Sequence, residues 1–334
     1  MKKNAEKAPD KPGSELLRGR LIRIIWTLAS ITLVGAMLGG FLMWRISNPS
    51  GRIFPASGEH AELYSKEQID KFVTSVLITV QNQPMGRENA PADMVFIVSF
   101  NAFEQRLTMV ALANETLLEL ENHEKKTLGE IYALGGPALL LNVVNQSFGL
   151  DLQKYACTDT NALAAMLDLL GGAQVELTPE EADYIGEALG EDGVDIQAGP
   201  IRLTGVQSMV HAMDKLSGQG QQGNLKRSLA LVYSVVSNMR ESATKEAMLP
   251  LLSLVFSSIQ TNLDFETLRE LAYEILKAKE MEYGQTIIPC EESFRDSEGM
   301  GDSLEIDTLR NGALLRETLY NASAVLESGD NPNL

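Results

Sequence analysis

The sequence is poor in the residues that most often carry covalent catalysis or bind transition metals. Its 334 residues include only two cysteines and three histidines. The histidines (His60, His123 and His211) are too scattered along the chain to indicate a zinc site. It also has no Gly-x-Ser-x-Gly, P-loop or His-Glu-x-x-His motif. The motifs of α/β-hydrolases, P-loop nucleotide-binding proteins and zinc proteases are therefore absent.

Basic residues are scarce outside the N-terminal region. The chain has 28 Lys and Arg against 45 Asp and Glu, a net charge of −17. Residues 1–45 hold eight basic and three acidic residues, so the remainder holds 20 basic and 42 acidic residues and carries −22. Because proteins bind nucleic acid largely by neutralising phosphates with Lys and Arg, this acidic body argues against a nucleic-acid partner.

One segment, residues 24–44, has the length and composition of a membrane span. A helix that rises about 1.5 Å per residue crosses a hydrocarbon layer of about 30 Å in this length. Trp26 and Trp44, the only tryptophans, stand near its two ends, where aromatic residues gather at membrane interfaces. Arginines shortly before the segment favour a cytoplasmic N-terminus. We therefore expect a basic cytoplasmic tail at residues 1–23 and a transmembrane helix at 24–44.

A cleavable signal peptide is the competing interpretation of this segment. Its apolar core would be shorter, and no small-x-small cleavage site directly follows residue 44. We therefore expect a single-pass protein of the cell membrane, with a linker at residues 45–71, one large extracellular domain at 72–321 and a disordered tail at 322–334.

Residues 132–177 have the pattern helix, strand, helix, strand. Gly135-Gly136-Pro137 suits a helix start. A short strand at 152–158, a helix capped by Asn161 and a strand at 173–177 follow. This order predicts an α/β fold in which helices cover the strands of a sheet.

Three apolar segments before this stretch have the composition of buried strands, and the last two are joined by a probable hairpin sequence, Asn-Ala-Phe-Glu-Gln. The segments are 72–80, 93–100 and 106–113. After the stretch, apolar spacing predicts further elements. These are helices at 226–239, 246–260 and 265–279, a strand at 285–289 and a closing helix at 309–320.

The chain also contains one Gly-x-Gly-x-x-Gly sequence, at Gly218, Gly220 and Gly223. A dinucleotide-binding fingerprint requires a strand before it and a helix after it. The residues before this one have a helical pattern, so we predict a flexible loop.

Four motifs follow one another in order: YALGG (132–136), LGGAQVEL (170–177), LTPEEA (177–182) and IRLTG (201–205). Their order resembles the heart of the LytR-CpsA-Psr (LCP) domain, and the resemblance covers roughly residues 72–320. It implies a central mixed sheet flanked by helices. It also implies a role in the cell envelope, since LCP enzymes transfer a glycopolymer phosphate from a polyprenyl-pyrophosphate lipid to a peptidoglycan sugar.

The resemblance implies a Mg²⁺ site at the ends of the first two strands. In the family, Asp-x-Arg follows the first strand and Arg-Ser-Asp opens the next, and the paired aspartates would hold the metal. The matching residues are Gln81 and Gln83, then Pro91, Ala92 and Asp93. Asp93 is thus the aspartate that is kept, with Gln81 offering a neutral oxygen. A single Asp at a strand start equally suits a turn or a cap.

The arginines that would clamp the pyrophosphate in the family are mostly replaced. Asn114 matches the Arg of Pro-Arg-Asp-Thr, and Met213 and Lys215 match an Arg-x-Arg pair. In the next motif, Asn224 replaces an Arg and Arg227 matches. Lys215 offers a point charge, which does not replace a bidentate guanidinium. The candidate residues of this degenerate site are Asp93, Asn114, Lys215, Asn224 and Arg227.

Two further features have open interpretations. The family encloses the polyprenyl tail between helices, which implies a lipid-sized cavity lined by the helices at 135–149 and 226–260, although apolar helix faces are more often plain core. Cys157 and Cys290 lie in or beside predicted strands. An extracellular setting permits a disulfide between them, and equally permits two buried thiols.

Two functions fit the sequence. One is an active Mg²⁺-dependent phosphotransferase that moves glycopolymer from polyprenyl-pyrophosphate to peptidoglycan. The other is a pseudoenzyme, or a relative with an altered ligand, that binds a membrane lipid, a polyprenyl-linked glycan or another envelope component. An acidic domain without its arginine clamp repels pyrophosphate, so the sequence favours the second.

Overall fold

The computed structural model describes residues 68–82, 90–193, 196–217, 220–241, 258–263, 280–297 and 302–320, together with 267, 271, 274, 275 and 277. The predicted tail (1–23), transmembrane helix (24–44) and C-terminal tail (322–334) lie outside these residues, as does most of the predicted helix at 246–260. No helix in the described part of the chain is both long enough and apolar enough to cross a membrane.

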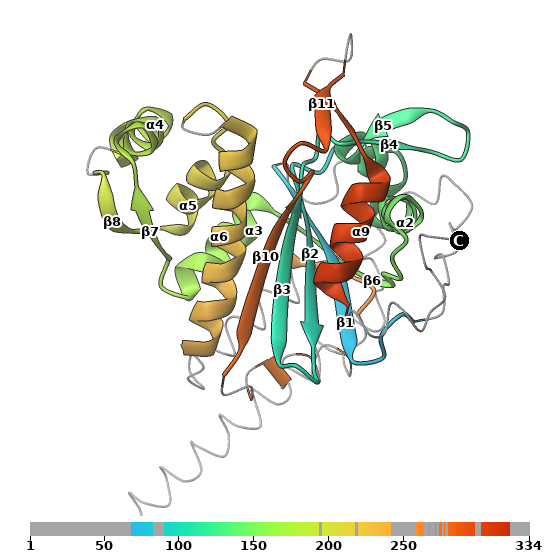
Figure 1. The fold of residues 1–334 in the computed structure, drawn as a ribbon. Coiled ribbons are helices and arrows are strands. Elements are labelled where there is room, and N and C mark those ends of the chain that lie inside the picture. The colour runs from blue at the N-terminus through green and yellow to red at the C-terminus, as the bar shows by residue number, and fades with distance from the viewer. Residues whose placement is uncertain are drawn as a thin grey trace, which may run out of the picture. The chain divides into compact units, whose positions relative to one another are not determined.

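A six-stranded mixed sheet forms the centre of the fold (Figure 1). Its strand order is β10-β3-β2-β1-β6-β9. The predicted hairpin of β2 and β3 is antiparallel, whereas β6 and β10 run parallel to β1 and β3. Five of the six predicted strands belong to this sheet, with small shifts at their ends. The strands are β1 (Val73–Gln81), β2 (Met94–Asn101), β3 (Arg106–Leu112), β6 (Lys154–Asp159), β9 (Gln260–Thr261) and β10 (Glu282–Ile288).

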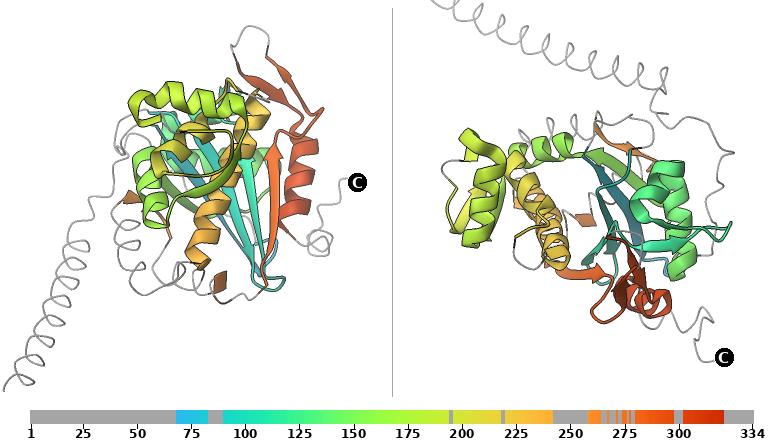
Figure 2. Two further views of the ribbon diagram at one scale, coloured as in Figure 1. Left: turned by 90° about the vertical axis from the view of Figure 1, so that its left-hand side faces the viewer. Right: turned by 90° about the horizontal axis from the view of Figure 1, so that it is seen from above.

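Two helices cover one face of the sheet (Figure 2). Helices α2 (Leu128–Phe148) and α9 (Thr308–Leu319) share a buried core with Leu77, Ile97 and Val110 of the first three strands. Alternate residues of a strand point to opposite faces, so the residues between these face a second core.

Three helices cover the second face. Helices α3 (Thr160–Leu169), α5 (Gly205–Met213) and α6 (Gly220–Glu241) pack with Phe96 and Met109. The predicted α/β fold, a mixed sheet flanked by helices, is thereby confirmed. Because α2 and α6 lie on opposite faces of the sheet, they do not line a common space (Figure 2). The sheet therefore separates the described parts of the two helices that were predicted to line a lipid cavity, and residues 242–257 of the second lie outside the described residues.

The glycines of YALGG interrupt a helix that has already begun. Thr127 caps α2: its hydroxyl accepts the Glu130 N–H at 3.2 Å, and the Glu130 carboxylate accepts the Thr127 N–H at 2.9 Å. Gly135 and Gly136 then take non-helical backbone angles, the second with φ +66°, and Pro137 starts the second half of the helix. The motif therefore marks a kink in α2, where the sequence predicted its start.

Helix α3 is capped by the last residue of the strand before it. Asp159 Oδ1 accepts the N–H of Ala162 at 2.8 Å, so Asp159 is the N-cap, whereas Asn161 lies inside the first turn. The predicted cap was two residues too late because the strand runs into the helix without a loop.

Strand β7 (Ala173–Leu177) does not join the central sheet. It pairs with β8 (Gly199–Leu203) in a separate antiparallel sheet, and α4 (Pro179–Leu189) and the short 3-10 helix η1 (Gly190–Gly193) lie between the two strands in the chain. We call β7, α4, η1, β8 and α5 the side lobe. It has a small core of its own, formed by Leu177, Ala182, Ile185 and Leu203.

The two Leu-Thr motifs build the helix starts of the side lobe. The Thr178 hydroxyl accepts the Glu181 N–H at 3.2 Å, and Thr204 caps α5 in the same manner. Gly205 then lies directly against α3, where an added Cβ would fall 1.9 Å from the carbonyl oxygen of Ala164. These motifs therefore specify scaffold contacts.

Two short sheets complete the fold near the ends of the central strands. β4 (Leu117–Glu119) pairs with β5 (Lys125–Thr127), and β11 (Phe294–Asp296) pairs with β12 (Leu304–Ile306). In the Gly-x-Gly-x-x-Gly sequence, Gly220 begins α6 and Gly223 lies in its first turn, while Gly218 lies outside the described residues. The predicted flexible loop is thus wrong for its last two glycines.

Candidate functional site

The sheet topology brings the predicted site residues to one edge of the sheet. The antiparallel registers place the ends of β1 and β3 beside the beginning of β2. Gln81, Asp93 and Asn114 therefore lie along one edge, which we call the site edge. Strand β6 also ends there and brings Asp159 into register with Gln81. Asp159 was not among the predicted site residues, although it directly follows the strand predicted at 152–158.

Gln81 and Asp93 hold together the connection between β1 and β2. Gln81 is 4% exposed, and its Nε2 donates to the carbonyl oxygen of Ala90 at 3.1 Å. Asp93 Oδ2 accepts the N–H of Asn82 at 2.6 Å, and the Asp93 N–H donates to the carbonyl of Val80 at 2.9 Å. The turn interpretation of Asp93 therefore has direct support.

Asp93, Asp159 and the amide of Gln81 lie where the resemblance implies a Mg²⁺ ion. Magnesium in phosphate-transfer sites is held by carboxylates together with phosphate oxygens and water. Here Gln81 is buried and neutral, and the carboxylates of Asp93 and Asp159 accept backbone N–H groups. Across the described residues, no group of three His, Cys, Asp or Glu side chains is placed to hold a metal.

Glu115 is the centre of a polar cluster at the site edge. Its carboxylate accepts hydrogen bonds from Lys215 Nζ and, at 2.6 Å, from Gln221 Nε2. The Asn114 amide, with its NH₂ turned toward Glu115, lies 2.5 and 2.8 Å from the two carboxylate oxygens. We call these four residues the Glu115 cluster. Lys215, which the sequence offered as a cation for phosphate, is thus ion-paired within the protein.

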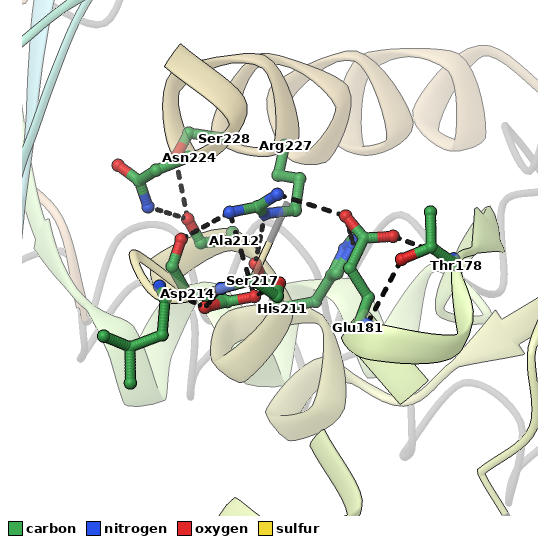
Figure 3. A network of polar contacts seen from close by, with 10 residues as sticks. Thr178, Glu181, His211, Ala212, Asp214, Ser217, Asn224, Arg227 and Ser228 are labelled. Carbon is green, nitrogen blue, oxygen red and sulfur yellow. Dashed lines mark hydrogen bonds and ion pairs between the residues drawn. The ribbon is translucent and has the colours of Figure 1, made fainter. Parts of the chain in front are cut away.

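Arg227 is buried where α4, α5 and α6 meet (Figure 3). Its Nη1 donates to Glu181 Oε1 at 3.1 Å, its Nη2 to the Asp214 carbonyl at 2.5 Å and its Nε to the His211 carbonyl at 3.1 Å. The side chain is only 8% exposed. The guanidinium therefore joins three helices. The N–H groups that do so are those with which an arginine clamp would bind phosphate.

Asn224 and Ser228 also bind the end of α5. Asn224 Nδ2 and Ser228 Oγ donate to the Ala212 carbonyl at 2.6 and 3.1 Å (Figure 3). The last carbonyls of a helix have no partner within it, so these side chains satisfy the C-terminus of α5 from α6. Asn224, at a family arginine position, therefore has a scaffold role.

Burial and charge set the protonation of this junction. Burial raises the pKa of the Glu181 carboxyl, but the Thr178 hydrogen bonds and the nearby His211 and Arg227 outweigh it and hold that pKa below its ordinary value. Burial lowers the pKa of His211, and the Glu181 carboxylate, 3.5 Å from Nε2, offsets this only in part. The junction therefore favours an ionised Glu181 beside a neutral His211.

Other cations do not rebuild the clamp among the described residues. Arg106 pairs with Glu104 at 3.1 Å and stands at the beginning of β3, at the opposite end from Asn114. Lys226 is exposed on α6, and Arg87 lies outside the described residues. The polar groups described at the site edge are thus three carboxylates, three amides and one ion-paired lysine. They belong to Asp93, Glu115 and Asp159, to Gln81, Asn114 and Gln221, and to Lys215.

The two cysteines are free thiols. Cys157 is in β6 and Cys290 follows β10, with three strands between β6 and β10 in the sheet. At about 4.8 Å per strand step, the separation is on the order of 19 Å, whereas a disulfide needs Cα atoms within about 7 Å. Burial raises the pKa of Cys157 to about 11. The disulfide interpretation is therefore wrong, and Cys157 is a buried thiol.

Comparisons with known proteins match both the sequence and this fold. Residues 56–314 match the LytR_cpsA_psr family. The chain is 22% identical over 250 residues to polyisoprenyl-teichoic acid–peptidoglycan teichoic acid transferase TagU of Enterococcus faecalis, covering 72% of this chain and 78% of that protein.

Solved structures of similar proteins share the fold. Protein gbs0355 of Streptococcus agalactiae superposes with a TM-score of 0.62 at 19% identity, covering 74% of this chain and 88% of that one. A LytR-CPS2A-psr family protein, YwtF (TagT), with bound octaprenyl pyrophosphate lipid superposes with a TM-score of 0.57 at 16% identity, covering 77% and 94%.

Proposed function

Because the chain belongs to the LytR-CpsA-Psr family, we propose that it is a cell-envelope protein that binds a polyprenyl-linked glycan without transferring it. In this proposal, residues 24–44 anchor it in the cell membrane, with the N-terminus in the cytoplasm and residues 72–321 outside. A polyprenyl-linked ligand is supported by two relatives: TagU is named a polyisoprenyl-teichoic acid–peptidoglycan transferase, and TagT holds octaprenyl pyrophosphate.

The proposed loss of transfer activity rests mainly on the hydrogen bonds that Arg227 makes within the protein. In the family, arginines would bind pyrophosphate through paired N–H groups, which stabilise the charge that develops during transfer. Arg227 is the matching arginine, and its N–H groups already bind Glu181 and two carbonyls of α5. Withdrawing it toward a ligand would leave Glu181 buried without its partner, which is strongly unfavourable.

The Glu115 cluster, which lies at the site edge, supports the same conclusion. Lys215 Nζ already has a carboxylate partner, and Glu115 adds negative charge where pyrophosphate would lie. The amides of Asn114 and Gln221 suit hydroxyl groups better than they suit a multiply charged anion. A ligand with a sugar or a singly charged phosphate at this position fits this chemistry.

The competing function is the active Mg²⁺-dependent phosphotransferase, with Asp93 as the remaining family aspartate. The test uses the full-length chain in nanodiscs with a polyprenyl-pyrophosphate glycolipid, with and without Mg²⁺, and measures phosphate release and transfer to peptidoglycan. We expect neither above the level of empty nanodiscs. Turnover that Asp93→Ala abolishes, and that the exposed control Asp296→Ala retains, would overturn the proposal.

Binding is measured separately from turnover. The same nanodiscs carry a polyprenyl-monophosphate glycan, and native mass spectrometry detects the bound lipid. We expect a complex with the glycan-bearing lipid. A chain that retains neither this lipid nor its pyrophosphate counterpart has no polyprenyl-linked ligand, which contradicts the binding half of the proposal.

A further inference from the structure

Two phenylalanines stand exposed side by side at the edge of the sheet opposite the site edge. Phe103, 74% exposed, lies in the turn between β2 and β3, and Phe72, 45% exposed, directly precedes β1. Their ring centroids are 5.5 Å apart. Lys71 Nζ lies 5.1 Å from the centroid of the Phe72 ring. We call Lys71, Phe72 and Phe103 the hairpin patch.

The backbone around the hairpin patch is fixed by hydrogen bonds. The Ala102 N–H donates to the Phe72 carbonyl at 2.9 Å, which ties the two segments together. Asn101 Oδ1 accepts the N–H of Phe103 at 3.0 Å, and Asp70 Oδ1 accepts the N–H of Phe72 at 2.9 Å. The backbone that carries the two rings is therefore held in place by the fold, so little backbone entropy is lost when they bind a partner.

The position of the hairpin patch in the chain suggests its partner. The patch lies where the chain enters the domain, 27 residues after residue 44, the end of the uncharged segment 24–44. At a maximum of about 3.6 Å per residue, this linker spans less than about 100 Å. A domain tethered in this way meets its own membrane surface at high effective concentration.

The hairpin patch is less acidic than the chain beyond residue 45 as a whole. Next to it, Arg106 pairs with Glu104 at 3.1 Å and stands in register with Glu282 of β10. Together with Lys71 and Asp70, these residues give a local net charge of −1. The chain beyond residue 45 carries −22 in total, and most of its surface is therefore repelled by anionic lipids. Aromatic rings beside a lysine are the side chains that settle at the boundary of headgroups and acyl chains.

We propose that the hairpin patch docks on the phospholipid surface of a membrane, with both rings in the headgroup region, an inference that rests on the proposed membrane anchor at residues 24–44. The proposal is independent of catalysis, since the patch and the site edge lie at opposite ends of the strands.

The test places a fluorescent probe beside the rings and keeps both rings. Ala102→Cys is labelled in the full-length chain with Cys290→Ser, while the buried Cys157 stays unlabelled. The chain is reconstituted in phosphatidylcholine vesicles containing nitroxide-labelled phosphatidylcholine, and quenching is measured. The control probe is at Leu309→Cys, an 84% exposed position at the start of α9.

We expect several-fold stronger quenching at position 102 than at 309. Phe72→Ser with Phe103→Ser should abolish the difference, and the control Phe294→Ser, at a 36% exposed ring of β11, should preserve it. If circular dichroism shows that the double variant is unfolded, Phe103→Ser alone takes its place. Equal quenching at both positions, or a difference that survives loss of the rings, overturns the proposal. If quenching increases with the number of protein copies per vesicle and does not depend on the nitroxide-labelled lipid, the partner is a second copy of the chain. That result also overturns the proposal.

Discussion

The guanidinium of Arg227 and the carboxylate of Glu181 form a buried ion pair, with Nη1 3.1 Å from Oε1. The two side chains are 8% and 12% exposed, and the pair joins α6 to α4 of the side lobe. Three further groups around it, the carbonyls of His211, Ala212 and Asp214, accept hydrogen bonds from α6. Arg227 and Asn224, which the sequence resemblance matches to ligand-binding arginines, thus fasten the side lobe to the body of the domain.

Arg227→Met should destabilise the protein strongly, because it leaves the buried Glu181 without its partner. Breaking a buried pair by removing one member costs about 3–5 kcal/mol. The free energy of unfolding from urea titration measures the loss. The control is Arg295→Met, since Arg295 is 80% exposed in its pair with Glu305 and its loss should cost less than about 1 kcal/mol. If Arg227→Met lowers the free energy of unfolding as little as Arg295→Met does, Arg227 is not needed for stability and could bind a ligand.

Acidification should weaken the fold, in part through His211. Its pKa in the folded protein lies below the ordinary 6.5, so the unfolded chain binds the proton more readily. The stability gained from the neutral His211 is therefore complete above about pH 6.5 and is lost as the pH falls toward the folded-state pKa. The lowered pKa of Glu181 acts in the same direction, starting below its ordinary 4.5.

The measurement is the free energy of unfolding between about pH 7.5 and pH 5. His211→Gln should flatten this dependence, because the variant has no proton to bind at the junction. His123→Gln serves as the control, since that side chain is 88% exposed. The same slope in the wild type and in His211→Gln would contradict the assignment.

Gly205→Ala should destabilise the contact between α3 and α5. The added methyl would fall 1.9 Å from the Ala164 carbonyl oxygen, so the helices must separate. Overpacking of this kind typically costs about 1–3 kcal/mol. Gly186→Ala in α4 is the matched control, because its Cβ would meet its nearest neighbour, the Gly193 carbonyl oxygen, at an ordinary 3.6 Å and alanine favours a helix. Thermal unfolding should show a lower Tm for the first variant only; an unchanged Tm would indicate that the helices shift without cost.

Much of the fold was visible in local patterns. The hairpin of β2 and β3, helix α3 and the closing helix α9 follow from apolar periodicity and turn residues, which act over a few positions. The kink at Gly135 was mistaken for a helix start because the capping residue, Thr127, lies eight residues earlier. Strand β7 was assigned as a strand, but its pairing with β8 is a long-range choice that its own five residues do not specify.

The candidate site was predictable in its position and less so in its chemistry. Gln81, Asp93 and Asn114 were expected together, and the strand registers place them along one edge. The orientation of Arg227 into the side lobe depends on Glu181, 46 residues earlier in the chain, and no local spacing connects the two. The pairing of Lys215 with Glu115, 100 residues apart, was hidden for the same reason.

Glu115→Gln should create affinity for anions at the site edge. Glu115 neutralises Lys215 and is itself 16% exposed, so the amide variant removes a negative charge and releases the ammonium group. We expect at least several-fold tighter binding of inorganic pyrophosphate to the full-length variant by isothermal titration calorimetry. Glu104→Gln is the control, because Glu104 is paired with Arg106 at the opposite end of the strands, and it should not change the affinity. If Glu115→Gln binds pyrophosphate no more tightly than the wild type, the Glu115 carboxylate is not what keeps Lys215 from binding anions.

The central claim is that the side chains at the family's clamp positions hold the fold and do not hold pyrophosphate. Its most direct test compares two lipids of equal chain length, a polyprenyl pyrophosphate and the corresponding polyprenyl alcohol, bound to the full-length chain in nanodiscs. Without a clamp, the pyrophosphate adds no favourable contact, so we predict that it binds no more tightly than the alcohol. Pyrophosphate lipid that binds ten-fold or more tightly, about 1.4 kcal/mol, would contradict the account.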